Sequence, residues 1–303
     1  MATTTTADVK LSALPPVTGR AGLRGVLASE FTKLRSVRST YWTIGALLVL
    51  SVGLAAAIGA GASSDLHNNP GDKLGFDATQ TSLAFFFYLG QLIIAVLGAM
   101  TITSEYSTGM IRTSLTAMPR RGNVFLSKLF VFTGVALVVS VVTSFLAFLV
   151  GQAVMSGTGV SASLSHSTTI PIAGRVSPQA VTATNSVVIT PGHVLTAIIG
   201  TALLVTMAAV IAFGLGAIIR HTAGAIASAI GLLFVVPIIV QLLPSTWRFD
   251  ILRFVPSAAG DVLSATVGDH PHLWSAWPQF AVTVIWALVL VAVGAYLFRK
   301  RDA

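Results

Sequence analysis

Cysteine is absent from this 303-residue sequence, and charged residues are scarce. Without cysteine the chain can form no disulfide, no thiol nucleophile and no cysteine–zinc site. Only 9% of the residues are charged and 54% are hydrophobic, with a mean hydropathy of +0.85. A soluble globular domain has about 25% charged residues. The composition therefore excludes a soluble enzyme, a DNA-binding module and a disordered scaffold.

Two catalytic motifs are missing as well. No lysine follows a glycine, so the sequence lacks the Gly-Lys-Ser/Thr element of a P-loop, and we expect no ATP hydrolysis by this chain. The only glutamates, Glu30 and Glu105, both follow serine, which excludes a His-Glu-x-x-His zinc-hydrolase helix. The long apolar stretches hold no ionisable residue, so a proton relay lacks its components. A sodium site built from backbone carbonyls stays compatible with the sequence.

Six apolar stretches are long enough to cross a bilayer as helices. A hydrocarbon core about 30 Å thick needs roughly 20 helical residues, because no backbone polar group can stay unpaired in lipid. The sequence therefore predicts an all-α polytopic membrane protein. Its six predicted spans cover about 41–61, 83–103, 129–150, 194–217, 222–243 and 279–298.

The basic residues outside these spans are unevenly distributed. Fourteen lysines and arginines fall on the side that holds both chain ends, and four fall on the other side. The positive-inside rule places the richer side in the cytoplasm. Both termini are thus predicted to be cytoplasmic. The six-span domain is predicted to cover 19–303, after a disordered tail at 1–18.

Apolar residues recur at three- and four-residue steps between Gly19 and Thr40, ahead of the first span. This spacing predicts an amphipathic helix, and its basic residues favour the headgroup layer of the membrane. Glu30 is expected among the polar residues of this helix. A plain positive-inside anchor is the alternative interpretation. The candidate interfacial residues are Phe31, Lys33, Leu34, Arg35 and Arg38.

The predicted outer segments differ in character. We expect a loop with a turn at 62–82, and an exposed segment at 156–192 that is mobile or weakly β-structured. The segment 244–278 is too apolar for a solvated loop. It predicts two short helices that dip into the outer leaflet and pack on the bundle, with an ordinary surface hairpin as the alternative.

Three details of this last segment bear on its structure and chemistry. Pro256 is expected to break the first short helix, and Ser257 to cap the second, over 258–266. His270 and His272 flank a proline beside Asp269 and have metal-ligand chemistry. A lasting metal site needs fixed geometry and supporting hydrogen bonds, so a solvated turn is the favoured interpretation.

The cytoplasmic stretch 103–128 carries the most information about function. Span two is expected to end near Glu105, and Gly109 permits a break in the helix. Apolar residues then share one face of a short helix that Pro119 stops, with Arg112 and Lys128 among the surrounding cations. Methionine suits adaptable protein contacts, so this face predicts a partner protein. A helix lying on lipid is the alternative. The apolar face comprises Met110, Ile111, Ser114, Leu115 and Met118.

At these residues the chain resembles the membrane subunit of an ABC-2 type exporter. The resemblance covers about 20–303 and rests on six spans with both ends inside, an interfacial helix SEFTKLRSVRSTYW, and Glu105-Tyr-x-x-Gly109-x-x-Arg112 followed by Pro119-Arg-Arg and Lys128. The paired outer helices around Phe254-Val-Pro-Ser-Ala-Ala-Gly260 and the basic C-terminal end complete it. The long segment 156–192 departs from the better-known members of that family.

The resemblance implies a division of labour. Two such subunits, identical or related, would pair with two cytoplasmic ATPases that bind ATP and Mg, so this chain itself needs no cofactor. The lipid of a bacterial cell membrane is an expected partner, and nucleic acid is not. The segment after span two would couple to the ATPase through Glu105, Tyr106, Gly109, Met110, Arg112, Leu115, Arg120 and Arg121.

The resemblance also implies a translocation path between the two membrane subunits, lined mainly by spans two and five. The path candidates are Phe86, Gln91, Pro237 and Gln241. An uncharged lining argues against strongly ionic cargo and fits lipids, amphipathic drugs and natural products. Two rival classes are a membrane-embedded enzyme, disfavoured because catalytic polar groups are missing at membrane depth, and a structural or sensory protein that binds a cytosolic partner.

Overall fold

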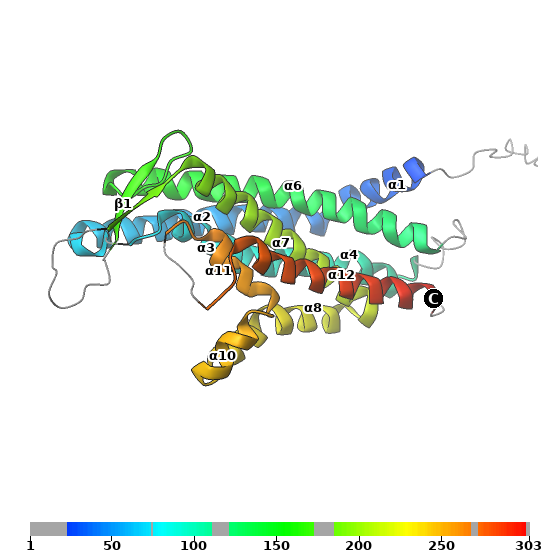
Figure 1. Cartoon of the computed structure of the whole chain (residues 1–303). Helices are drawn as coiled ribbons and strands as arrows, with labels where there is room; N and C mark the ends of the chain where they lie inside the picture. The colour runs from blue at the N-terminus through cyan, green and yellow to red at the C-terminus, as the bar shows by residue number, and fades with distance from the viewer. Residues whose placement is uncertain (1–22, 74, 111–120, 173–184, 268–271, 301–303) are drawn as a thin grey trace, which may run out of the picture.

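The computed structural model describes residues 23–300, apart from 74, 111–120, 173–184 and 268–271. Within these residues six helices are long and apolar enough to cross a membrane, which confirms the all-α polytopic fold. The start of the described chain and its end lie at the same end of the bundle (Figure 1). The predicted tail at 1–18 lies outside the described residues. The six helical spans cover Arg38–Asn68, Ala78–Ser107, Gly122–Thr158, Pro191–Ile219, Thr222–Gln241 and Ala276–Lys300.

The first span runs further than its hydropathy predicts. α1 (Leu23–Ser36) and α2 (Arg38–Asn68) are separated only by Val37, whose backbone is extended. α2 continues to Asn68 because helix-compatible Ser and Ala follow the apolar run, and Pro70 then stops it at the short helix η1 (Pro70–Lys73). The predicted loop at 62–82 is therefore mostly helical, and only its turn is confirmed.

Spans two and five each contain one wide π turn. Span two consists of α3 (Ala78–Phe85), the π turn η2 (Phe86–Gly90) and α4 (Gln91–Ser107). Span five consists of α8 (Thr222–Ile230), the π turn η4 (Gly231–Val235) and α9 (Val236–Gln241). Proline at position 237 has no backbone N–H, so it cannot complete the regular α-helical bond at this point. Single π turns inside α-helices are frequent at functional sites.

α7 (Pro191–Ile219) is the central helix of the bundle. α4, α6 (Arg121–Met155), α8 and α12 (Ala276–Lys300) all pack against it (Figure 1). Small residues permit these approaches, as is usual between membrane helices. A β-carbon on Gly98 of α4 would collide with the carbonyl oxygen of Ala209 on α7, and one on Gly294 of α12 would lie 2.9 Å from the Cβ of Ala217.

The segment 156–192 combines a packed part with a hairpin. A 3-10 turn η3 (Ser156–Thr158) follows α6, and strands β1 (Thr168–Ile172) and β2 (Asn185–Ile189) pair antiparallel. The predicted β-structure is confirmed. The predicted exposure is wrong in part, because three apolar side chains cover the outer ends of α2, α6 and α7. These buried residues are Val160, Ala162 and Ile189.

Two short helices precede the last span, as predicted. α10 (Ser245–Leu252) has no buried residue and projects from the bundle (Figure 1), so the expectation that both helices pack on the bundle is wrong for α10. A 3-10 turn η5 (Pro256–Ala258) leads into α11 (Ala259–Ser264), which packs on α7 and α12. The predicted Ser257 cap is also wrong. Because η5 begins at Pro256, Ala258 precedes α11 and no side chain caps it.

An outer carboxylate fixes α11 to the start of span two. Asp77 is buried, and its side chain accepts hydrogen bonds from the backbone N–H of Gln80 at 2.9 Å, of Thr266 at 2.5 Å and of Val267 at 2.7 Å. The Thr266 hydroxyl donates a fourth at 2.9 Å. We call Asp77 and these donors the outer lock. Asp77 thus caps α3 and also holds the chain that follows α11.

Candidate coupling site and outer cavity

The candidate coupling residues begin at the end of α4 that is predicted to be cytoplasmic. α4 ends at Ser107, and Gly109 adopts a left-handed backbone with φ of 70°. Glycine enters this region without the steric cost that a β-carbon brings, which explains the helix end there. Met110 follows and is 47% exposed. Arg121 begins α6, while Arg112, Leu115 and Arg120 lie outside the described residues.

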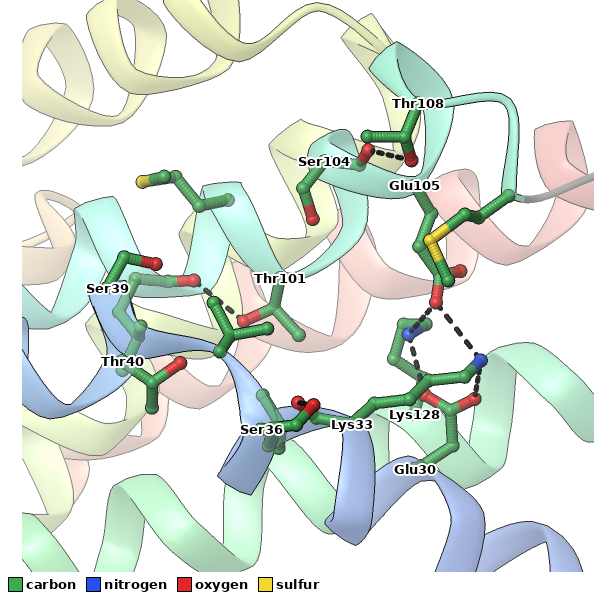
Figure 2. Close-up of a pocket in the computed structure, with 15 residues that line it drawn as sticks. Glu30, Lys33, Ser36, Ser39, Thr40, Thr101, Ser104, Glu105, Thr108 and Lys128 are labelled. Atoms are coloured by element: carbon green, nitrogen blue, oxygen red, sulfur yellow. Dashed lines mark hydrogen bonds and ion pairs between the residues drawn. The ribbon is translucent and has the colours of Figure 1, made fainter.

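Two glutamates and two lysines meet beside this helix end in a closed ring (Figure 2). Lys128 Nζ donates to Glu30 Oε2 at 2.6 Å and to Glu105 Oε1 at 2.8 Å. Lys33 Nζ donates to Glu30 Oε1 at 2.8 Å and to Glu105 Oε1 at 3.3 Å. We call Glu30, Lys33, Glu105 and Lys128 the charge ring. It joins α1, α4 and α6, which supply these side chains.

The charge ring is neutral and mostly removed from water. The side chains of Glu30, Glu105 and Lys128 are 5%, 8% and 7% exposed, and that of Lys33 is 34% exposed. Buried charges need paired partners, because desolvation costs several kcal/mol per isolated ion. Each ring member contacts two of opposite charge. The ring therefore holds only while all of its members are in place.

The structure places Glu30 and Lys128 differently from the prediction. Glu30 was expected among the polar residues of the N-terminal helix, and Lys128 around the short helix that follows span two. Both are buried instead, since α1 packs on α6. One signal in the sequence points to this arrangement: Val26, Glu30 and Leu34 are four residues apart and therefore lie in one row of a helix. Val26 is buried in that row, and Leu34 packs against the main core cluster.

The remaining interfacial candidates divide between the two faces of α1. Lys33 belongs to the charge ring and Leu34 to the packed row. Phe31, Arg35 and Arg38 are exposed, so their side chains are free to meet lipid headgroups or solvent. The predicted helix is confirmed at Leu23–Ser36, and its place in the headgroup layer stays a prediction.

The charge ring sets the protonation of its two members on α1. Burial by itself would raise the pKa of Glu30, but Lys128 and then Lys33 outweigh it, so this pKa lies below its ordinary value of 4.5. Burial would lower the pKa of Lys33, but hydrogen bonding to Glu30 and the charge of Glu105 outweigh it, so this pKa lies above 10.5. Both groups are fully charged at neutral pH.

We expect the attachment of α1 to depend on pH accordingly. Glu30 has a lowered pKa in the folded protein. Its contribution to the stability of the α1 attachment is therefore present above pH 4.5 and is lost as the pH falls through this lowered pKa. Lys33 has a raised pKa, so its contribution is present below 10.5 and is lost as pH rises through the higher folded value. A spin label on Thr32→Cys, the only cysteine in the chain, should be immobile between about pH 5 and 10 and mobile in stronger acid. The same label in a Glu30→Gln background should show no acid transition, and an unchanged transition there would contradict this assignment.

The next residue of α4 contacts the opposite side of the bundle. The guanidinium of Arg220 lies 4.9 Å from the ring centroid of Tyr106 and donates to the carbonyl oxygen of Leu297 at 3.2 Å. Arg220 has a left-handed backbone, φ 59°, at the tight turn between α7 and α8. The consecutive residues Glu105 and Tyr106 thus connect the end of α4 with α1 and α6 on one side and α7 and α12 on the other.

A cavity of about 550 Å³ lies between the π turns of spans two and five and the outer helix pair. Three of the four path candidates, Gln91, Pro237 and Gln241, line it together. Phe86 does not, because it is fully buried in the core. We call this space the outer cavity. Other lining residues, which the sequence did not single out for the path, are Phe87, Tyr88, Arg248, Phe249, Ser257 and Asp261.

The polar groups of the outer cavity are few and come from different elements. The Tyr88 hydroxyl donates to Asp261 Oδ1 at 3.3 Å, which links span two to α11. The Arg248 guanidinium lies 4.5 Å from the ring centroid of Phe249, and His272 stacks on the same ring at 3.7 Å. Asp269 and His270 lie outside the described residues. Aromatic walls with isolated polar groups can hold an amphipathic molecule.

A comparison with known protein families bears on both sites. A family model described as ABC-2 family transporter protein matches residues 26–209, more than half of the chain. No curated protein matches the chain. The family match runs from α1 into α7 and includes all four residues of the charge ring. Six helices of membrane-spanning length accompany it. The chain therefore belongs to the ABC-2 family of transporter proteins and is a multi-pass membrane protein.

Proposed function

We propose that this chain is the permease subunit of an ATP-driven exporter in a bacterial cell membrane. Two such subunits pair, and separate cytoplasmic ATPases drive them. The charge ring is the single observation that carries the proposal. It lies at the cytoplasmic end and joins the two helices that flank the segment 108–120 to α1. A force on that segment acts on Glu105 near the end of α4 and on Lys128 near the start of α6.

The ring makes the three helices move as one unit. Glu105 is 6% exposed, so it acts as a positioning residue and leaves contact with an ATPase to exposed neighbours such as Met110. Displacing α4 alone would separate Glu105 from both lysines in a poorly solvated place, which is costly. Displacing α1, α4 and α6 together keeps every pair. The motion therefore passes to α2, which continues from α1 after Val37.

The outer cavity is the proposed place of the cargo. Its two sides belong to spans two and five, and each side contains a π turn, where the helical hydrogen bonding is locally irregular. Single π turns inside α-helices are frequent at functional sites. The lining is aromatic and apolar, with the amides of Gln91 and Gln241 and, contrary to the expected uncharged lining, the charged side chains of Arg248 and Asp261, so the proposed cargo is amphipathic. ATP and Mg are bound by the partner ATPase, since no P-loop exists in this sequence.

Affinity purification of the chain from its native membranes tests the proposal. An ATPase subunit with a Walker A motif should co-purify, and the complex should hydrolyse ATP. Met110→Asp places a charge on an exposed apolar side chain at the coupling segment and should reduce the recovered ATPase about tenfold. Leu164→Asp is the matched control, because Leu164 is also exposed and apolar but lies in the outer segment.

Three results would contradict the proposal. Recovery of the chain with no ATPase would favour the structural or sensory alternative. Equal recovery for Met110→Asp and the unchanged chain would remove the coupling segment from the contact. Extracellular labelling of Thr108→Cys by a membrane-impermeant reagent would place the whole site on the wrong side of the membrane. The chain has no native cysteine, so that labelling reports a single position.

A further inference from the structure

A cavity of about 440 Å³ lies between α1, the start of α2 and the cytoplasmic half of α4 (Figure 2). We call it the inner cavity. The charge ring forms one part of its lining. Apolar side chains form another part, and hydroxyl groups, Thr101 and Ser104 among them, complete it. A ligand that matches the charged and the apolar parts has a charged head and an apolar body. The apolar lining residues are Leu34, Val37, Leu97, Met100 and Met110.

The residues beside the inner cavity favour a position at the level of the lipid headgroups. Val37, Ser39 and Thr40 line it, and the next two residues, Tyr41 and Trp42, are 56% and 80% exposed. Exposed tyrosine and tryptophan at the end of a span are typical of the membrane–water interface. Phospholipids of the cytoplasmic leaflet are therefore the molecules beside this cavity.

One part of the cavity favours an anion. Lys33 is the most exposed member of the charge ring, with 34% of its side chain accessible, so the accessible charge is positive. The N-terminus of α2 also lines the cavity, and its cap residue Val37 offers no side-chain acceptor to the first N–H groups. A helix N-terminus attracts phosphate through these N–H groups and the helix dipole. Lys33 offers the accessible ammonium group to a phosphodiester in this cavity.

Another part of the cavity favours a hydrogen-bond donor. Glu105 is 94% buried, and Figure 2 shows its carboxylate directed from α4 toward α1. Oε1 accepts hydrogen bonds from Lys33 and Lys128. Oε2 is buried without a hydrogen-bond partner among the described residues. A buried carboxylate oxygen without a donor is unfavourable. An ammonium group that carries N–H bonds would satisfy it once the side chain turns this oxygen toward the cavity.

We propose that the inner cavity binds a phospholipid whose headgroup carries a primary ammonium group. Its phosphate lies at Lys33, its ammonium at Glu105, and its acyl chains along the apolar residues of the cavity. Such a lipid bridges α1 and α4 next to the charge ring. A trimethylated ammonium has no N–H to donate, and a glycerol headgroup has no positive charge, so both should bind less tightly. This proposal is independent of cargo and of the ATPase.

Native mass spectrometry of the full chain tests the proposal. The protein is equilibrated with equal amounts of phosphatidylethanolamine, phosphatidylcholine and phosphatidylglycerol of identical acyl chains, and the retained lipids are counted. The unchanged chain should retain phosphatidylethanolamine about tenfold over each of the others. Thr101→Phe fills the cavity while leaving the charge ring intact, because the Thr101 hydroxyl bonds only to its own helix at Leu97.

Two further variants complete the experiment. Ser104→Phe replaces an exposed lining residue and keeps the test valid if Thr101→Phe does not fold. Val138→Phe, on the exposed face of α6, is the matched control and should behave like the unchanged chain. Both cavity variants should lose the preference. Equal retention of the three lipids, a preference that survives Ser104→Phe, or displacement of the lipid by soluble phosphoethanolamine would overturn the proposal.

Discussion

Replacing Lys128 with methionine should lower the free energy of unfolding by about 3–5 kcal/mol, the usual cost of removing one partner from a buried ion pair. Lys128 contacts both glutamates of the charge ring, Glu30 at 2.6 Å and Glu105 at 2.8 Å. Methionine keeps the volume but leaves two buried carboxylates to share Lys33. Reversible unfolding in mixed detergent micelles measures the difference. Lys300→Met is the control, since Lys300 is an exposed lysine of α12 and should change stability by less than about 0.5 kcal/mol.

The pH dependence of the stability lost in Lys128→Met shows whether lost charge pairing or lost packing causes it. Lys128 is the largest of the charges that lower the pKa of Glu30, so that pKa should rise in Lys128→Met. Glu30 then loses its charge at a higher pH, and the stability gap to the unchanged chain should narrow as pH falls. The double variant Glu30→Gln/Lys128→Met should recover part of the loss, because one glutamate still pairs with Lys33. A gap that stays constant with pH would mean that lost packing causes the effect.

The six spans could be predicted from sequence because membrane crossing is a local property. Each span needs about 20 apolar residues in a row, and nothing distant decides whether it forms. The helix α1 and the tight turn between α7 and α8 are local in the same sense. The charge ring is different. Glu30 and Lys128 are 98 positions apart, and no pattern within one helix shows that they meet.

The same distinction explains what the sequence did not show. Phe86 and Phe87 are both apolar residues of span two, and Phe87 lines the outer cavity whereas Phe86 is buried in the core. The predicted cap at Ser257 failed because a 3-10 turn shifted the start of α11. Charges near a span are usually solvated, which predicts a loop position for Asp77 within 62–82. Its partners lie 189 and 190 positions away, beyond any sequence spacing.

Asp77→Ala should lower the free energy of unfolding by about 3 kcal/mol or more. The substitution removes the cap of α3, worth about 1 kcal/mol. It also leaves backbone N–H groups of Thr266 and Val267 without an acceptor, at about 1–3 kcal/mol for a buried one. Unfolding in mixed micelles measures the total, and amide hydrogen exchange at Thr266 and Val267 locates it. Asp65→Ala, at an exposed aspartate of α2, should change stability by less than about 0.5 kcal/mol.

Asparagine at the same position separates charge from geometry in the outer lock. Asp77→Asn keeps one carbonyl oxygen in place, but it gives up the negative charge and the second acceptor. The carboxylate serves α3 with one oxygen and the chain after α11 mainly with the other, so the amide can satisfy only one of the two. We therefore expect Asp77→Asn to lose about half as much stability as Asp77→Ala. Faster exchange at Thr266 with α3 unchanged would show that the amide keeps the helix cap. The outer helix pair, and with it one side of the outer cavity, would then be released while span two stays folded. Equal losses for asparagine and alanine would show instead that the charge itself holds the lock.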